Sequence, residues 1–289
     1  MIRAVPIAVA IAGVLCSVAV AGGVSVKPCT RYEATVRARV ASGLNVEEYP
    51  QFLDVVPVCV SRPTVLAEHF AAVQWRFADG SGKTIARPHE GASPQTLFSR
   101  EWKTYRYCFW TPDNAAKVEF FPMNGAKGNR AEVELVEVRE APPSDGALNF
   151  NGDFSAADDA AWGWQLVGAA CFQNIAPGRS VVSTFDGHLN GDLFPVKPGR
   201  RIRIEATCSD PVLLGDRYDS TNVRIAFYST YAEASGKKQK KQMMDAPLVV
   251  KGRHATASCT CRVPDGRRWA RISVWHGFAE RITVTEDAL

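Results

Sequence analysis

The sequence predicts an all-β fold with two β-sandwich domains in tandem. Three observations support this prediction: a series of motifs that occurs twice in the same order, runs in which apolar and polar residues alternate, and turn residues that separate these runs. Helix signals are few. The clearest one, at residues 64–70, predicts only two turns with Thr64 as the cap.

The repeat consists of matching segments in two halves of the chain. The first copy contains them at residues 26–28, 32–36, 73–77, 81–83 and 111–113. The second copy contains them at residues 196–198, 202–206, 223–227, 235–237 and 263–265. Because the order is the same in both copies, we predict a duplicated β domain.

Alternation with a period of two predicts the individual strands, because successive side chains of a strand point to opposite faces. In residues 32–40, for example, Tyr32, Val36 and Val40 share the apolar phase, whereas Glu33 and Arg37 lie in the polar phase. In chain order, strands are expected at residues 32–40, 73–77, 103–109, 118–121, 133–138, 180–185, 201–208, 223–228, 255–263, 270–275 and 281–285. Each such strand buries one face and turns the other toward solvent or a ligand.

A polar stretch with two prolines, at residues 139–146, marks the boundary between the copies. We predict a first domain at residues 22–140, a linker at 141–147 and a second domain at 148–289. The first copy carries an insertion within residues 42–70 and lacks a counterpart of residues 148–194. It is therefore the degenerate copy, and the second copy is the fuller domain.

The N-terminus predicts a secretory signal peptide at residues 1–21. Arg3 precedes an apolar stretch at residues 4–20, and the small residues Ala19 and Ala21 stand at the positions that a signal peptidase reads. A membrane anchor is the alternative, but about 17 apolar residues are at the lower limit for spanning a bilayer. We expect a secreted protein, extracellular or periplasmic, that does not span a membrane after cleavage.

Composition narrows the range of partners. The apolar fraction of 46% is enough to fill two cores, and the net charge of +4 is too small to argue for a nucleic acid as partner. Residues 237–241 contain four lysines, which indicate either a solvated hairpin tip or a contact for an anionic polysaccharide.

Seven of the eight cysteines remain after cleavage of the leader, and export permits disulfides. An odd number leaves one thiol unpaired or linked to a second chain, so self-association stays open. Cys259 and Cys261 lie two apart on one strand and face the same side, so they are not expected to bridge each other. Cys208 lies in the apolar phase of its own strand, and our candidate bridge joins it to Cys259 or Cys261.

The second copy opens with residues 149–154, Asn-Phe-Asn-Gly-Asp-Phe, followed by Trp162, by Pro198-Gly199 before the strand at 202–206, and by residues 263–266 before the last strands. This order resembles the jelly-roll carbohydrate-binding modules with a galactose-binding-like fold. The resemblance covers the second half of the chain well, and the first half only in its later strands. It implies two jelly-roll β-sandwiches and, less directly, sugar binding, since one fold hosts many functions.

The resemblance also implies a structural calcium, because many such modules hold one. Asp153, with Glu286 or Asp287, is the candidate ligand set. Two positions depart from the pattern: Ser155 follows Phe154, and the last strand, residues 281–285, contains no Asp. No other cofactor is expected.

Sugar binding needs aromatic faces together with planar hydrogen-bonding groups. In residues 269–275, the polar phase holds Trp269, Arg271 and Trp275, and in residues 223–228 it holds Arg224 and Tyr228. If these outward phases share a sheet, they form one aromatic and arginine-rich surface, with the packing of both tryptophans into a core or rim as the alternative. Trp164, near the opening strand, is a further candidate for a site at a loop edge.

The leading hypothesis is a secreted, non-catalytic protein that binds a polysaccharide or a cell-surface glycan by aromatic stacking and arginine hydrogen bonds. Enzyme signals are weak: the histidines are scattered without an HExxH spacing, and no GxSxG motif or facing carboxylate pair occurs. Two alternatives stay open, an extracellular structural or protein-interaction role and a glycan-active hydrolase with an unrecognised site.

Overall fold

The computed structural model describes residues 23–43, 71–86, 95–97, 99–124, 128–142, 146–157, 162–167, 170–176, 179–208, 220–235, 242–251 and 254–287. The predictions made for residues 1–21, 64–70 and 237–241 lie outside these ranges. Within the described ranges, no helix has the length and apolar composition needed to cross a membrane.

The first sandwich pairs two antiparallel sheets. One sheet has the strand order β1-β7-β3-β4 with β5 also paired to β3, and the other has the order β6-β2-β8. The strand bounds are β1 (Val24–Ser25), β2 (Arg31–Ser42), β3 (Ala72–Ala78), β4 (Thr84–Ala86), β5 (Gln95–Thr96), β6 (Lys103–Trp110), β7 (Lys117–Met123) and β8 (Arg130–Glu140).

The second sandwich repeats this scheme with more strands. Its large sheet has the order β10-β11-β17-β14-β15, with β9 paired to β11 and β12 paired to β17, and its small sheet has the order β16-β13-β18. The bounds are β9 (Trp164–Val167), β10 (Ala170–Ala176), β11 (Arg179–Gly191), β12 (Phe194–Pro195), β13 (Arg201–Thr207), β14 (Ser220–Tyr228), α2 (Tyr231–Ser235), β15 (Gln242–Lys251), β16 (Thr256–Arg262), β17 (Trp269–Ala279) and β18 (Arg281–Glu286).

The duplication is preserved in the strand pairing. β2 lies between β6 and β8, as β13 lies between β16 and β18, and β7 pairs with β3 as β17 pairs with β14. The matching Val-Lys-Pro segments also make equivalent backbone hydrogen bonds. The Val26 N–H donates to the Ala116 carbonyl at 3.0 Å, and the Val196 N–H donates to the Arg268 carbonyl at 2.8 Å. The predicted all-β fold of tandem jelly-roll sandwiches is confirmed.

Alternation places the cores where the sequence predicts them. On β2 the apolar phase, from Tyr32 to Val40, is buried between the two sheets, and on β13 Ile202 and Ile204 do the same in the second sandwich. The opposite phases carry the polar side chains, as expected for sheets with one wet face.

The two sandwiches differ at their edges. Among the described residues of the first sandwich, no strand stands where β11 pairs with β17 in the second, which agrees with the predicted loss of the opening strands. The first sandwich also has only three residues in β4, whereas the corresponding β15 has ten residues and lies against β16. The side of the first sandwich between β4 and β6 is therefore not closed by its own strands.

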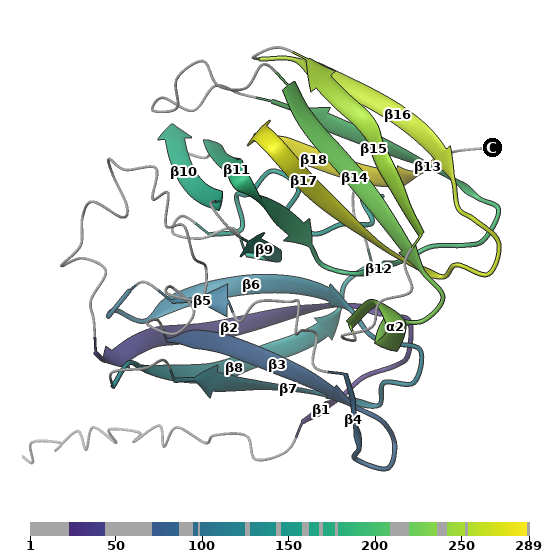
Figure 1. The fold of residues 1–289 in the computed structure, drawn as a ribbon. Helices are drawn as coiled ribbons and strands as arrows, with labels where there is room; N and C mark the ends of the chain where they lie inside the picture. Colours follow the sequence, from purple (N-terminus) through teal and green to yellow (C-terminus); the bar gives the residue numbers. More distant parts are fainter. Residues whose placement is uncertain are drawn as a thin grey trace, which may run out of the picture.

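The second sandwich packs against this side (Figure 1), with α2 next to β4 and β12 next to β6. Trp162 stacks on Tyr105 with ring centroids 4.4 Å apart and planes 8° apart. Tyr231 of α2 meets Phe77 edge-on at 5.9 Å. The apolar core of the first sandwich thus continues without interruption into side chains of the second.

Candidate functional site: the outer face of the large sheet

The outward face of β11, β17 and β14 gathers polar and aromatic side chains. Alternation sends Val274 and Val223 into the core and leaves their neighbours in sequence on the other face. Because β17 lies between β11 and β14, residues of three segments far apart in sequence become neighbours there. They are His188 and Asn190 of β11, Ser273 and Trp275 of β17, and Asn222 and Arg224 of β14. We call these six residues the outer-face cluster.

Trp275 is the centre of the outer-face cluster. His188 is its register partner on β11, and the two rings stack with centroids 4.1 Å apart and planes 10° apart. From the opposite neighbour, β14, the Arg224 guanidinium carbon lies 4.8 Å from the indole centroid. The indole is therefore held between an imidazole and a cation, each favourable against an aromatic face.

Hydrogen-bonding groups surround this stack. The Ser273 hydroxyl donates to the Asn190 side-chain oxygen at 2.8 Å, and Asn222 is the register partner of Trp275 on β14. All members except the buried Ser273 are partly exposed. Within the described chain, no acceptor lies within hydrogen-bonding distance of the buried Arg224 Nε. The cluster thus presents amide and guanidinium groups at a surface.

Trp275 and Arg224 are the predicted binding residues that the structure brings together. His188 and Asn190 were missed, because Asp186-Gly187 indicates a turn after the strand expected at residues 180–185. Asn222 was missed because it lies one residue before the strand expected at residues 223–228. β11 instead continues to Gly191, and the alternation of His188 and Asn190 around Leu189 was the signal that could have extended it.

Trp269, Tyr228 and Arg271 do not form part of an open surface, contrary to the prediction. Their exposed fractions are 0%, 2% and 6%, because the first sandwich covers this end of the sheet. The Trp269 indole N–H donates to the Asp113 carboxylate at 3.1 Å, across the junction. The sequence predicted correctly which face of the sheet these residues occupy. Their position at one end of the strands, however, places them in the interface between the two sandwiches.

Trp164 is also a core residue and not a loop-edge site. It is 3% exposed, packs against Phe154 with ring centroids 5.3 Å apart, and donates its indole N–H to the Asn151 carbonyl at 2.8 Å. Both the hydrogen bond and the ring contact of Trp164 are made within the second sandwich. Its side chain is therefore unavailable to a ligand.

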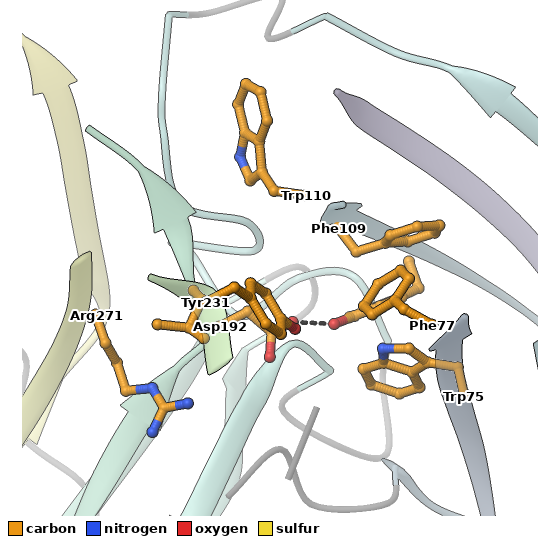
Figure 2. Close-up of a pocket in the computed structure, with 9 residues that line it drawn as sticks. Trp75, Phe77, Phe109, Trp110, Asp192, Tyr231 and Arg271 are labelled. Atoms are coloured by element: carbon orange, nitrogen blue, oxygen red, sulfur yellow. Dashed lines mark hydrogen bonds between the residues drawn. The ribbon is translucent and has the colours of Figure 1, made fainter. Parts of the chain in front are cut away.

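The interface also buries titratable groups. Figure 2 shows Asp192, Tyr231 and Arg271 of the second sandwich facing Trp75 and Phe77 of the first. The Tyr107 hydroxyl of β6 donates to the Asp192 carboxylate. Burial outweighs this hydrogen bond and the nearby Arg271 charge and raises the Asp192 pKa to about 7. Burial and the Asp192 charge together raise the Tyr107 pKa well above its usual value, so the phenol stays the donor.

The residues named for calcium do not fit such a site. The Asp153 carboxylate accepts a hydrogen bond from the Ser155 hydroxyl at 2.9 Å, and Asp287 lies 3.6 Å from the Arg201 guanidinium. In the described parts of the chain, no three His, Cys, Asp or Glu side chains come close enough to share a metal ion. Calcium needs six or more oxygen ligands, which this arrangement does not supply.

The candidate disulfide is also absent, because register separates its partners. Cys208, Cys259 and Cys261 are free thiols, and the Cys208 N–H donates to the Ala255 carbonyl at 2.9 Å, while Cys259 pairs with Ile204. Cys208 and Cys259 are thus offset by four residues, or roughly 13 Å along the strands. A disulfide requires Cα atoms about 4.4–6.8 Å apart.

No protein-family model matches the sequence, and no curated protein is significantly similar to it. Among solved structures, the tandem of two CBM22 domains from Paenibacillus barcinonensis Xyn10C is similar over 91% of this chain and 80% of that chain, with 12% identity and a TM-score of 0.35. The tandem CBM51 modules of Sp3GH98 from Streptococcus pneumoniae are similar over 91% of this chain and 78% of theirs, with 9% identity and a TM-score of 0.21. The CBM22-1 and GH10 modules of Clostridium thermocellum xylanase 10B, in complex with xylohexaose, match 49% of this chain and 28% of theirs, with 10% identity and a TM-score of 0.34. The fold described above rests on the strand order and register of this chain, and these similarities are reported beside it.

Proposed function

We propose that this protein binds carbohydrate without catalysis, through the outer-face cluster of its second sandwich. The observation that carries the proposal is the layered arrangement of His188, Trp275 and Arg224 across three adjacent strands, with amide groups beside it. Sugars offer many hydroxyl groups, which pair well with planar amide and guanidinium groups held in fixed positions. A leader at residues 1–21 is part of this proposal, because it would bring the protein to extracellular or periplasmic glycans.

The proposed mechanism differs from simple stacking on Trp275. Both faces of that indole are covered by side chains of the same protein, so a sugar ring cannot lie flat on it. We assign Trp275 the role of a positioning residue that holds His188 and Arg224 in place. Arg224, Asn222 and Asn190 then supply the hydrogen bonds to the ligand.

A panel of polysaccharides, with retention of the full chain as the readout, tests this proposal. Arg224→Ala removes the charged donor and is expected to weaken binding about tenfold to a hundredfold, the range for a hydrogen bond made by a charged group. Arg203→Ala is the matched control, since Arg203 is an exposed arginine of the small sheet that bonds Ser258 at 3.3 Å.

Loss of retention in Arg224→Ala, with Arg203→Ala unchanged, supports the outer-face cluster. Absence of retention on every polysaccharide by folded protein contradicts carbohydrate binding and favours a structural role. An equal loss in both variants contradicts the assigned site.

A further inference from the structure

A groove lies between the two sandwiches, lined in part by residues of α2 and β4. Figure 1 shows the place of these two elements in the fold, next to each other. Its cavity volume is about 370 Å³, at the lower end of the range for small-ligand sites. Its lining combines residues of both sandwiches: Asp79, Lys83, Thr84, Ile85, Asp113 and Asn114 from the first, and Thr230, Tyr231 and Ala232 from the second. The groove therefore exists only while the sandwiches are docked, and it is separate from the outer-face cluster.

Asp113 is fixed in this groove by two neutral donors. The Trp269 indole N–H donates to one carboxylate oxygen at 3.1 Å, and the Cys29 thiol donates to the same oxygen at 3.1 Å. Burial, together with the Asp113 carboxylate, raises the Cys29 pKa to about 11, so the thiol remains an uncharged donor at neutral pH. Asp113 is thus held in position while neither of these donors neutralises its negative charge.

Asp79, the second carboxylate in the groove lining, stabilises the turn between β3 and β4. One of its oxygens accepts hydrogen bonds from the Ser81 hydroxyl at 2.6 Å and from the Lys83 N–H at 3.0 Å, which fixes the β3–β4 turn. The Ser81 bond is the main reason that the Asp79 pKa lies below its usual value, and the Lys83 charge contributes. The ionised Asp79 thus has a cation beside it within the lining, which leaves Asp113 as the excess negative charge.

The rest of the lining suits a hydroxylated ring. Asn114 and Thr230 are exposed and offer an amide and a hydroxyl, and Ile85 and Tyr231 form an apolar side. Arg268 is close enough to influence the Cys29 thiol, but it does not line the groove. The lining is therefore complementary to a small ligand with hydroxyl groups and one positive charge.

We propose that this groove is a second ligand site, which binds a protonated amino-sugar unit. The ammonium group of the ligand faces Asp113, its hydroxyl groups face Asn114 and Thr230, and its ring lies along Ile85. Because both sandwiches supply the contacts, binding also stabilises their docking.

Calorimetric titration of the full chain with glucosamine, and with glucose as the neutral counterpart, tests the proposal. Glucosamine is expected to bind at least tenfold more tightly than glucose. Asp113→Asn keeps an oxygen acceptor for the Trp269 indole but removes the charge, so it should weaken glucosamine binding about tenfold. Asp265→Asn, in an exposed turn of the second sandwich, is the matched control and should leave the affinity unchanged.

A second variant, Lys83→Gln, distinguishes a loss of ligand binding from a loss of folded protein. Removing this like charge should strengthen glucosamine binding severalfold, which is the opposite sign from Asp113→Asn and cannot result from loss of folded protein. The same titration is repeated with chitosan oligosaccharides. An affinity equal to that of glucosamine shows that the site binds a single amino-sugar unit, and a higher affinity shows that it binds the end of a chain.

No binding of glucosamine to folded protein, or equal affinities in Asp113→Asn and Asp265→Asn, overturns the proposal. Arg224→Ala separates this site from the outer-face cluster, because it should leave glucosamine binding intact even where it abolishes polysaccharide retention. Loss of both activities in Arg224→Ala would overturn the assignment of two sites.

Discussion

The two sandwiches share one strand scheme, but only the second closes on itself. In the second sandwich, β15 lies against β16, and β9, β10 and β11 extend the large sheet. In the first, the short β4 leaves the side toward β6 open, and aromatic residues of the second sandwich fill it. A copy that has lost strands can thus keep a packed core when its neighbour supplies the missing apolar surface, because burial is non-directional and does not depend on chain order.

Breaking the aromatic contact at this junction should have the largest effect. Trp162 is fully buried and stacks on Tyr105, so Trp162→Ala is expected to cost about 3–5 kcal/mol of unfolding free energy, measured by urea denaturation. Much of this loss should appear in the first sandwich, although the substituted residue belongs to the second.

Trp102→Ala is the matched control on the outer face of the first sandwich. Trp102 is only partly buried, and the guanidinium groups of Arg37 and Arg39 lie over its ring at 5.2 and 4.9 Å. A loss of no more than about 1 kcal/mol is expected from such an exposed cation–π contact. Similar losses in both tryptophan variants would contradict the shared core.

A pH titration of stability should give the next largest effect. The Asp192 pKa is raised from 3.8 to about 7 in the folded protein, so between these values the folded state keeps a proton that the unfolded state has released. Stability should therefore fall as the pH rises from about 4 to about 7, by at most about 1.4 kcal/mol per unit, and level off above.

Asp192→Asn is the control for this titration. The amide oxygen still accepts the Tyr107 hydrogen bond but does not titrate, so the variant should lack this component of the slope and be more stable than the parent at pH 8. Urea denaturation of both proteins across the pH range measures the difference. Parallel curves would show that Asp192 titrates normally and would contradict its burial in the junction.

A smaller effect is expected where a glycine and a cysteine occupy equivalent positions. Gly199 follows Val-Lys-Pro in the second copy with φ of +80°, and Cys29 follows it in the first with φ of 48°. A Cβ at Gly199 would have only an ordinary contact, 3.5 Å from an Arg262 nitrogen. Gly199→Ala should therefore cost about 1 kcal/mol, the backbone term alone.

Gly80→Ala, in the first sandwich, isolates that backbone term. Its Cβ would also meet nothing within 4 Å, and its φ lies outside the left-handed region, so the substitution should leave stability unchanged or raise it slightly. Thermal denaturation of both variants measures the comparison. A loss at Gly80 equal to that at Gly199 would contradict the special role of the left-handed conformation.

The sequence predicted most strands because alternation is a local property. The apolar phase of β2 and that of β13 follow from residues two apart, and both were placed correctly. The missed strands include the short β4 and β12, which depend on pairing with β3 and β17. They also include the longer β10 and β15. The end of β11 was missed because Asp186-Gly187 has the composition of a turn.

For the candidate site residues, the sequence predicted correctly which face of the strand they share, but it did not predict which of them the first sandwich covers. The sequence by itself determined that Trp269, Arg271 and Trp275 share one face of a strand, because the direction of a side chain alternates along any strand. Only the tertiary structure decided that Trp269 is buried at the junction and Trp275 lies on the outer face. The reason is that Trp269 meets Asp113, 156 residues away, and contacts at that distance depend on how two sandwiches dock and not on any local pattern.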